Sequence, residues 1–554
     1  MGSATLCARV LVEELITRGV RDVVLAPGSR SAPLAYELFE ADKIGLLTLH
    51  VRIDERAAAF LALGLAKATQ TPVPVVTTSG TAAANLHPAV LEASHSHVPL
   101  LVVTADRPGH LLGTGANQTT DQHGLFAAHV RLETHLDDTG GGPHVWRFHL
   151  ARSLSAAAGD RSRSPGPVHV NISFSEPLSP GPEQVPSHPD LVVESVPPAV
   201  APTVLPVGAQ TVVVAGDAPP EVGCVAAEVA ARAGVPLLAE PSSNARRGAE
   251  AIALYRVLLA SSLAEDIERV VVYGHPTLSR PVARLLARDD VELIVVSDYA
   301  DWTDPGARAS LVTGAVRLDP GTTPQDWLGR WQQSDAELRP EIDRLVGSVP
   351  LVEGADPPPS GLTGPGLAAG LWSCLTSTDT LVVGSSNPVR DLDLAPISPD
   401  PALVYANRGL SGIDGTVSTA VGVALATGRP THALMGDLTF LHDVGGLVIG
   451  PAEPRPDLRI VVANDNGGSI FATLEHGLPA HMGAFERIFG TPHGVDLRPV
   501  VEGLGATYRR IERPEEVEEV LSEPPLGLEV VEAVVDRSRR RTLSAEIARL
   551  AGQI

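Results

Sequence analysis

Residues 431–438 read THALMGDL and residues 458–468 read LRIVVANDNGG, and these two stretches decide the fold class of the chain. In each, a short apolar run that is typical of a buried strand leads into a loop with a carboxylate or amide side chain. Asn464 follows Asp437 by 27 residues. We therefore predict two strands of a parallel α/β sheet that carry polar groups at their carboxyl ends, where such folds bind ligands.

The same order of elements recurs along the whole chain. Short β-branched runs end in loops with Gly or Ser, and longer Ala/Leu-rich segments follow them. Continuous apolar runs between helical patterns indicate buried parallel strands with crossover helices. A helix is expected over residues 57–68, and the expected strands cover residues 22–26, 47–51, 73–77, 100–104, 211–215, 270–273, 293–296, 380–383, 432–434, 458–462 and 528–531.

Two proline-rich stretches divide the chain into three blocks. Residues 177–206 hold nine prolines, a density that blocks both helices and sheet ladders, and residues 347–366 include Pro357-Pro358-Pro359. The blocks between them are residues 1–176, 207–346 and 367–554, each of ordinary domain size. We expect three doubly wound α/β domains.

Composition excludes several classes of protein. The 554 residues are 44% apolar and 19% charged, as in ordinary globular proteins, and the net charge of −23 comes without a basic stripe for nucleic acid. Cys7, Cys224 and Cys374 are isolated, so we expect a reducing cytosol and no disulfide framework. No signal peptide or transmembrane run is recognisable. Residues 537–550 are expected to form a packing terminal helix, without stable membrane insertion.

Residues 431–438 and 458–468 carry oxygen ligands that suit a hard cation. The carboxylate of Asp437, the amide oxygen of Asn464 and the main-chain carbonyl of Asn466 form an oxygen donor set. Mg²⁺ prefers such ligands and takes its remaining ones from water and substrate phosphate, and Mn²⁺ is the alternative ion. The glycines that follow allow the backbone to approach an anion closely.

This arrangement resembles the thiamine diphosphate (ThDP) fingerprint, GDG followed 25–30 residues later by NN. Here Gly436-Asp437-Leu438 replaces GDG, and Asn464-Asp465-Asn466 replaces NN, so the register of the second motif is less closely matched. The resemblance implies a catalytic glutamate in a separate N-terminal domain, after a strand and at the start of a helix. Glu55 occupies that position.

Further motifs resemble one family in particular, the 2-succinyl-5-enolpyruvyl-6-hydroxy-3-cyclohexene-1-carboxylate (SEPHCHC) synthases of menaquinone biosynthesis, called MenD. The resemblance covers the first and third blocks nearly throughout, and the middle block thinly. The motifs, in chain order, are APGSRS (26–31), IDER (53–56), TSGT (78–81), ADRP (105–108), GANQ (115–118), GHPTLSR (274–280), NRG (407–409), SGIDG (411–415) and IFGTPH (488–493).

Membership would imply pyrimidine, middle and diphosphate domains, with ThDP and Mg²⁺ as cofactors and active sites between subunits of a homodimer or homotetramer. The family decarboxylates 2-oxoglutarate and adds the succinyl carbanion equivalent to isochorismate, a transferase reaction. The resemblance makes Glu55 the catalytic residue and Asp437, Asn464 and Asn466 the metal ligands. It assigns the cofactor to Glu55, Asn387, Pro388, Ile413, Gly436, Asp437, Leu438, Asn464, Asn466, Gly467, Gly468 and Ile470.

Arginines explain how an acidic chain would bind the family's two substrates. Both substrates are dianions, and bidentate guanidinium groups suit carboxylates better than a lysine point charge. We expect the arginines to gather at strand-end loops. The substrate candidates are Ser29, Arg30, Arg107, Asn117, Gln118, Arg280, Ser386, Arg390, Arg408 and Phe471.

Three other functions remain open from the sequence. A different ThDP-dependent 2-oxo-acid decarboxylase, similar to acetohydroxyacid synthase, would use pyruvate and often a flavin. A degenerate ThDP-fold protein would bind the cofactor without turnover. A Mg²⁺-dependent phosphohydrolase would use Asp437 and be indifferent to Glu55.

Overall fold

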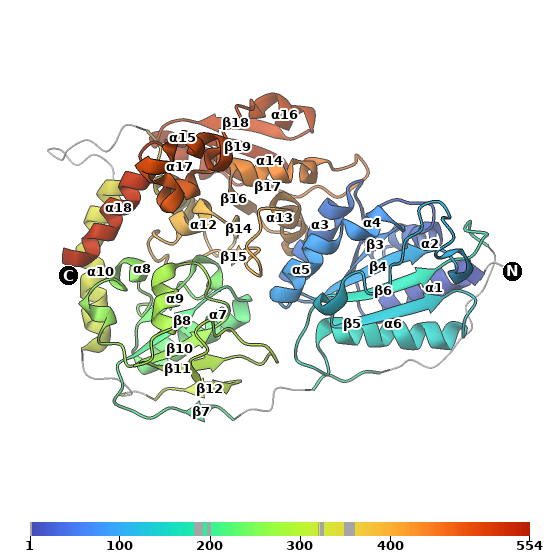
Figure 1. The fold of residues 1–554 in the computed structure, drawn as a ribbon, viewed down its shortest axis with the longest axis horizontal. Coiled ribbons are helices and arrows are strands. Elements are labelled where there is room, and N and C mark those ends of the chain that lie inside the picture. Colours follow the sequence, from blue (N-terminus) through green and yellow to red (C-terminus); the bar gives the residue numbers. More distant parts are fainter. Residues whose placement is uncertain are drawn as a thin grey trace. The chain divides into compact units, whose positions relative to one another are not determined.

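The computed structural model describes residues 3–181, 192–196, 201–319, 321, 326–347 and 361–553 (Figure 1). The chain divides into two compact units, and neither is continuous in sequence. Unit 1 consists of residues 1–197, 409–428 and 443–456. Unit 2 consists of residues 198–408, 429–442 and 457–554.

Unit 1 contains one six-stranded parallel sheet, in the order β2-β1-β3-β4-β6-β5. Its central strands are fully buried, which explains their continuous apolar sequence. The strands are β1 (Asp22–Leu25), β2 (Thr48–Val51), β3 (Val73–Thr77), β4 (Leu100–Asp106), β5 (Leu132–Asp137) and β6 (Val168–Ser173).

Helices cover both faces of this sheet. The helices are α1 (Ser3–Thr17), α2 (Ala32–Lys43), α3 (Glu55–Thr69), α4 (Thr81–Ala84), α5 (His87–His95), α6 (Pro143–Ala158) and α13 (Thr416–Thr427), with 3-10 turns at Gly109–Leu111, Ala127–His129 and Val444–Leu447. Helices α1, α2 and α6 form one hydrophobic core with the strands. Helix α3 packs against β1, β3 and β4 and against α5 and α13.

Helices α3 and α13 approach each other backbone to backbone. A Cβ atom on Gly64 would lie 2.2 Å from the carbonyl oxygen of Thr419, and one on Gly422 would lie 2.3 Å from that of Leu61. Any larger residue would push the helices apart. The middle of α3 is therefore packed against a segment that is more than 300 residues away in sequence.

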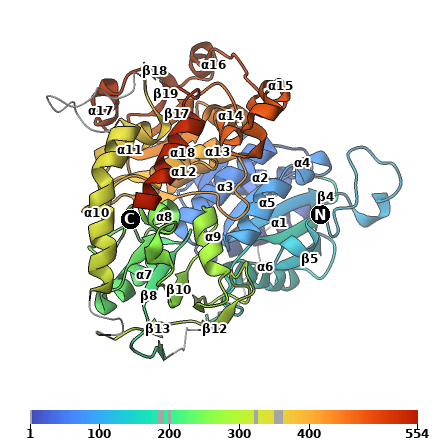
Figure 2. The ribbon, with the colours of Figure 1, turned by 60° about the vertical axis from the view of Figure 1, so that its left-hand side comes forward.

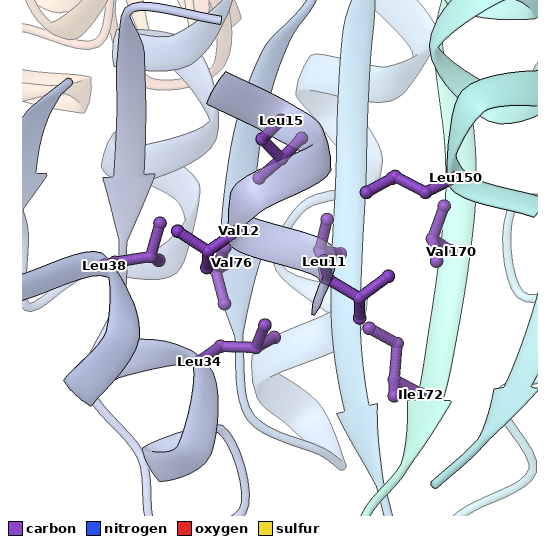
Figure 3. Close-up of a pocket in the computed structure, with 10 residues that line it drawn as sticks. Leu11, Val12, Leu15, Leu34, Leu38, Val76, Leu150, Val170 and Ile172 are labelled. Atoms are coloured by element: carbon purple, nitrogen blue, oxygen red, sulfur yellow. The ribbon is translucent and has the colours of Figure 1, made fainter. Parts of the chain in front are cut away.

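The cavity in Figure 3 lies inside the α1, α2 and α6 face of unit 1. Its volume is about 20 Å³, and all ten side chains that line it are apolar, among them Leu11, Leu38 and Ile172. It has no room for a substrate and no polar group to orient one. It is a packing void, and the functional site must be sought at the strand ends.

Unit 2 contains two larger parallel sheets and a two-stranded one. Their strand orders are β12-β11-β10-β8-β9, β15-β14-β16-β17-β19-β18 and β13-β7. The strands are β7 (Thr203–Val204), β8 (Thr211–Ala215), β9 (Leu237–Ala239), β10 (Arg269–Tyr273), β11 (Glu292–Val296), β12 (Ala309–Thr313), β13 (Val316–Arg317), β14 (Thr380–Val383), β15 (Leu403–Tyr405), β16 (Thr431–Gly436), β17 (Leu458–Asn464), β18 (Thr507–Ile511) and β19 (Leu528–Val534).

Helix α18 packs against α10 within unit 2, as Figures 1 and 2 show. Leu543, Ile547 and Leu550 of α18 join the core of the middle sheet, which confirms the predicted packing helix. The α-helices of unit 2 are α7 (Pro220–Ala233), α8 (Tyr255–Leu258), α9 (Arg280–Leu286), α10 (Trp327–Val346), α11 (Gly364–Cys374), α12 (Asn387–Leu392), α14 (Asp437–His442), α15 (Met482–Phe485), α16 (Leu497–Gly503), α17 (Glu515–Leu521) and α18 (Arg540–Leu550). Short helical turns span Pro241–Ser243, Ser262–Ala264, Ser469–Thr473, Glu475–Gly477, Pro479–His481, Glu486–Gly490 and Ala551–Gln553.

The α/β fold class predicted from the sequence is confirmed, and each of the eleven predicted strands overlaps an observed strand, with bounds that differ by at most three residues. The three large sheets fall one in each predicted block. Parts of the two predicted linkers, residues 182–191, 197–200 and 348–360, lie outside the described residues. None of the described helices is long and apolar enough to cross a membrane.

Two buried histidines make the free energy of unfolding depend on pH. Burial lowers the pKa of His169 on β6 and of His432 on β16 to about 4. In the unfolded chain each takes up a proton at about pH 6.5. The stabilisation is therefore complete above about pH 6.5 and is lost progressively as the pH falls from there through about 4, up to about 3 kcal/mol for each group.

We expect the urea concentration at the midpoint of unfolding to fall as the pH is lowered from 7 to 4.5, and to fall less steeply in His432→Gln. Exposed His144 supplies the matched control, because His144→Gln removes an imidazole that is already hydrated in the folded chain. Equal slopes in His432→Gln and the wild type would contradict a neutral, buried His432.

Candidate functional site at the carboxyl ends of the strands

Strands β16 and β17 lie side by side in parallel, and both end at the predicted metal site. Gly436 at the end of β16 is opposite Ala463 of β17, so Asp437 and Asn464 emerge at the same edge of the sheet. Asp437 is the first residue of α14, and its exposed fraction is only 2%. The structure thus brings the two quoted stretches together, as the sequence predicts.

The Asp437 carboxylate is held from three sides. Its Oδ1 accepts a hydrogen bond from the Leu438 amide at 2.7 Å, and its Oδ2 accepts one from the Gly467 amide at 2.7 Å. The Nε2 atom of His493 lies 3.0 Å from Oδ2. Burial raises the pKa of Asp437, while His493 and the two amides lower it. These contacts fix the carboxylate in one orientation.

The Asn464–Gly468 loop folds tightly beneath Asp437. Asn464 Oδ1 accepts from the Asn466 amide at 2.9 Å, and Asn464 Nδ2 donates to Glu532 at 2.6 Å. Asn466 has a left-handed backbone, with φ of 55°. A Cβ atom on Gly467 would lie 1.9 Å from the carbonyl oxygen of Gly490, so glycine is required there.

The donor set of this loop fits Mg²⁺ bound with a diphosphate. Among the described residues, no group of three His, Cys, Asp or Glu side chains could hold a metal ion. A cation here would instead use one carboxylate, one amide oxygen and one carbonyl, which suits a hard ion that keeps other ligands from water or phosphate. In the structure the Asn466 carbonyl accepts a hydrogen bond from Arg537 Nη1 at 3.2 Å.

Two residues of this site were not predicted from the sequence. Both lie within quoted motifs but had no role assigned: Asp465, whose carboxyl accepts from the Ser469 hydroxyl, and His493. Burial and the neighbouring Asp437 raise the pKa of Asp465 to about 7. Asn387 donates to Ser469 Oγ at 2.7 Å, which ties the predicted cofactor residue on α12 to the same loop.

Two of the predicted substrate arginines are neighbours in unit 2. Arg390 on α12 donates to the Ser386 carbonyl at 2.6 Å, and burial together with the charge of Arg408 lowers its pKa. Arg408 is 3% exposed and donates to Thr277 Oγ1 at 3.1 Å. The Arg280 side chain, by contrast, is 68% exposed and lies 3.7 Å from Glu475.

The aromatic and apolar candidates occupy separate segments. Ile470 and Phe471 lie in the 3-10 turn that follows the Asn464–Gly468 loop, and the Phe471 ring centroid is 5.6 Å from that of Phe489. Ile413 belongs to unit 1, just before α13. Pro388 is at the start of α12.

Glu55 is the first residue of α3 in unit 1, as predicted. The Asp54 side chain caps this helix by accepting from the Ala57 amide at 3.0 Å. The Glu55 side chain is partly exposed, and Asn85 Nδ2 lies 3.4 Å from its Oε2. Within the described part of unit 1, no other side chain hydrogen-bonds to this carboxylate.

Arg30 and Arg107 form a second arginine pair, in unit 1. Arg30 donates to the Phe174 carbonyl at 3.0 Å, and Arg107 donates to the Gln118 carbonyl at 3.0 Å and to the Ser79 hydroxyl. Burial and the charge of Arg30 lower the pKa of Arg107. The other candidates nearby are exposed loop residues, namely Ser29, Asn117 and Gln118.

Comparisons with known proteins agree with this geometry. The N-terminal TPP binding domain of thiamine pyrophosphate enzymes matches residues 6–125, and the C-terminal TPP binding domain matches residues 394–526. Proteins named 2-succinyl-5-enolpyruvyl-6-hydroxy-3-cyclohexene-1-carboxylate synthase align over nearly the full length. The one from Kineococcus radiotolerans is 48% identical over 99% of both chains. The one from Nocardioides sp. is 46% identical over 99% of this chain and 98% of its own length. The one from Paenarthrobacter aurescens is also 46% identical, over 98% of this chain and 95% of its own length.

Proposed function

The chain belongs to the SEPHCHC synthase family of thiamine diphosphate enzymes, and from this premise we propose how its residues carry the reaction. The enzyme is a carboligase of menaquinone biosynthesis. In the reaction, 2-oxoglutarate loses CO₂ and the succinyl carbanion equivalent adds to isochorismate. The tight loop beneath Asp437, with Gly467 against the Gly490 carbonyl, is the observation that best supports a bound diphosphate.

The cofactor and its metal would be held at the ends of β16 and β17. Asp437, Asn464 and Asn466 are the proposed Mg²⁺ ligands. Gly436, Leu438, Gly467, Gly468, Asn387, Pro388 and Ile470 are the proposed cofactor contacts in unit 2. When bound, ThDP supplies the nucleophilic carbon and the electron sink that decarboxylation requires.

Glu55 is the proposed catalytic acid and base. A carboxyl group at the start of α3 can hold a proton at one oxygen and exchange it with a ring nitrogen of the cofactor. Its neighbour Asn85 would orient it. Ile413, which belongs to the same unit, is the proposed apolar support beneath the cofactor.

The arginines are the proposed substrate clamps. The pair Arg30 and Arg107, and the pair Arg390 and Arg408, each place two guanidinium groups close enough to lower a pKa. Such clustering favours a dianion over a monoanion such as pyruvate. Exposed Arg280, with Ser29, Asn117, Gln118, Ser386 and Phe471, completes the proposed substrate set.

The proposed assembly is a homodimer or homotetramer with active sites between subunits, and the proposed compartment is the cytoplasm. Family membership supports the assembly. The proposed domains are residues 1–176 for the pyrimidine, 207–346 for the middle and 367–554 for the diphosphate domain, joined by linkers 177–206 and 347–366.

Release of CO₂ from 2-oxoglutarate, with ThDP and Mg²⁺, tests the function. We expect turnover that depends on isochorismate and yields the adduct by mass spectrometry. Turnover of pyruvate instead, with a yellow flavin-containing protein, would indicate the acetohydroxyacid-synthase-like alternative. Tight ThDP binding without CO₂ would indicate a degenerate binder, and hydrolysis of aryl phosphates without need of Glu55 would indicate a phosphohydrolase.

A further inference from the structure

A short segment of the middle block, residues 240–244, lies against the residues around Arg408. It follows β9, and both of its polar end residues are buried, with exposed fractions of 1% for Glu240 and 5% for Asn244. Buried polar side chains are costly unless they are hydrogen-bonded. Their partners therefore show what the segment does.

Glu240 holds the loop that contacts Arg408. Its Oε1 accepts from the Leu278 amide at 2.9 Å, and its Oε2 accepts from the Thr277 amide at 3.4 Å. Thr277 in turn accepts from Arg408 Nη2 through its hydroxyl at 3.1 Å. Arg408 is also close enough to Glu240 for its charge to lower a pKa that burial raises to about 8.

Asn244 holds the strand that leads to Arg408. Its Nδ2 donates to the Val404 carbonyl at 3.0 Å, and its Oδ1 accepts from the Val404 amide at 2.9 Å. Val404 is the centre of β15, the edge strand of its sheet. The Asn244 side-chain amide therefore hydrogen-bonds to the backbone of this edge as a neighbouring strand would. Asn244 has φ of 56°, a left-handed conformation that asparagine adopts more readily than most residues.

We propose that Glu240 and Asn244 are positioning residues for Arg408, through which the middle domain orients a substrate-binding guanidinium. Arg408 is fixed from both directions, by β15 before it in the chain and by Thr277 at its tip. A guanidinium held in this way offers its donors along set directions and loses little entropy on binding a carboxylate. The inference rests on the proposed role of Arg408, and it gives the thinly matched middle block a part in catalysis.

Steady-state kinetics of four variants of the full chain tests this. Asn244→Gly keeps the left-handed backbone but deletes the amide, and Glu240→Ala deletes both acceptors. We expect each to raise KM for one of the two substrates about tenfold, as loss of a hydrogen bond that orients a charged group would. KM for the other substrate, kcat and ThDP affinity are expected to change less than about threefold.

Rescue and control variants separate positioning from general stability. Glu240→Gln keeps one hydrogen-bond acceptor and is uncharged, as a carboxyl group with a pKa of about 8 mostly is near pH 7. It is therefore expected to restore the wild-type KM at that pH. Glu529→Gln is the matched control, because Glu529 is also a buried partner of a buried arginine, Arg459, at the opposite end of the strands. An equal rise of KM in this control would overturn the proposal.

A second readout does not depend on turnover. Buried Arg408 should resist phenylglyoxal in the wild type, and peptide mass spectrometry should find it modified in Asn244→Gly and Glu240→Ala. If Arg408 stays protected from phenylglyoxal in these variants and KM is unchanged, the positioning role is refuted. A wild type that turns over neither substrate would instead refute the proposed function, and the phenylglyoxal result would then decide the positioning alone. If Asn244→Gly fails to fold, Glu240→Ala and its glutamine rescue make the same test.

Discussion

Glu55→Gln is expected to lower kcat for SEPHCHC formation by about 100- to 10,000-fold, the range over which a positioned general acid or base acts. Glutamine has the same size and still accepts a hydrogen bond, but it cannot give up or take a proton at the side-chain oxygen. ThDP affinity should fall far less, because the residues proposed to hold the diphosphate and the metal belong to unit 2. Stopped-time CO₂ release and calorimetric titration with ThDP and Mg²⁺ measure the two quantities.

Asp54→Asn is the matched control for Glu55. It removes the adjacent carboxylate but keeps the helix cap, since Asn and Asp cap helices about equally well. It is expected to keep most of the activity. Turnover of Glu55→Gln at near the wild-type rate would remove Glu55 from the mechanism, whatever the cofactor affinity.

Asp437→Asn is expected to weaken binding of ThDP with Mg²⁺ by about 100-fold or more. Loss of even a residue that only hydrogen-bonds to a metal ligand costs about 10- to 100-fold in affinity, and here the proposed charged ligand itself would be lost. The asparagine oxygen can still accept from one of the two amides, so the loop should stay folded. Calorimetric titration at several Mg²⁺ concentrations measures the loss, and excess Mg²⁺ should restore part of the affinity.

The control for Asp437 is Asp379→Asn, in the same block. Asp379 directly precedes β14 and accepts from Thr376 at the amino end of the sheet, away from the proposed cofactor. Its replacement should leave ThDP affinity within about twofold of the wild type, because Asp379 is only partly buried and touches none of the proposed cofactor residues. Unchanged binding in Asp437→Asn as well would place the metal elsewhere in the protein.

Local features of the chain were predictable because the physics that fixes them is local. Buried central strands read as continuous apolar runs, and β3, β8 and β14 have the bounds expected from the sequence alone. The strands that were not predicted are β5, β6, β7, β9, β12, β13, β15 and β18, and all of them except β6 are edge strands or belong to the two-stranded sheet. Strands β5 and β18 carry charges and several exposed residues, so no continuous apolar run marks them, and His169 and Asn171 interrupt the apolar run of β6.

Contacts between distant parts of the chain could be predicted only where a general rule of the fold brings the residues together. The Asp437 and Asn464 pair was found because parallel strands end at a common edge, which is a general rule of the fold. Asn244 and Val404 are 160 residues apart, and nothing in either stretch indicates that they meet. His493 lay within a recognised motif, but only the folded chain shows its ring beside Asp437.

The gathering of the arginines was predicted in outline. Arg30 with Arg107 and Arg390 with Arg408 are neighbours within their own units. Arg280 has its guanidinium at an exposed ion pair with Glu475, which contributes little to stability and leaves the side chain able to turn toward an anion. Whether all five meet at one substrate stays a prediction.

The discontinuity of unit 1 imposes an order on its synthesis. Helix α3 is complete by residue 69, but the helix that packs against it, α13, is not made until residue 427, and the last segment of unit 1 ends at residue 456. At ordinary elongation rates the ribosome needs tens of seconds to synthesise the residues between α3 and α13, and the side of α3 that packs against α13 is uncovered during this time. Throughout that interval the ribosome-bound chain presents a hydrophobic helix to chaperones, and a stall or truncation before residue 416 would leave that surface uncovered for good.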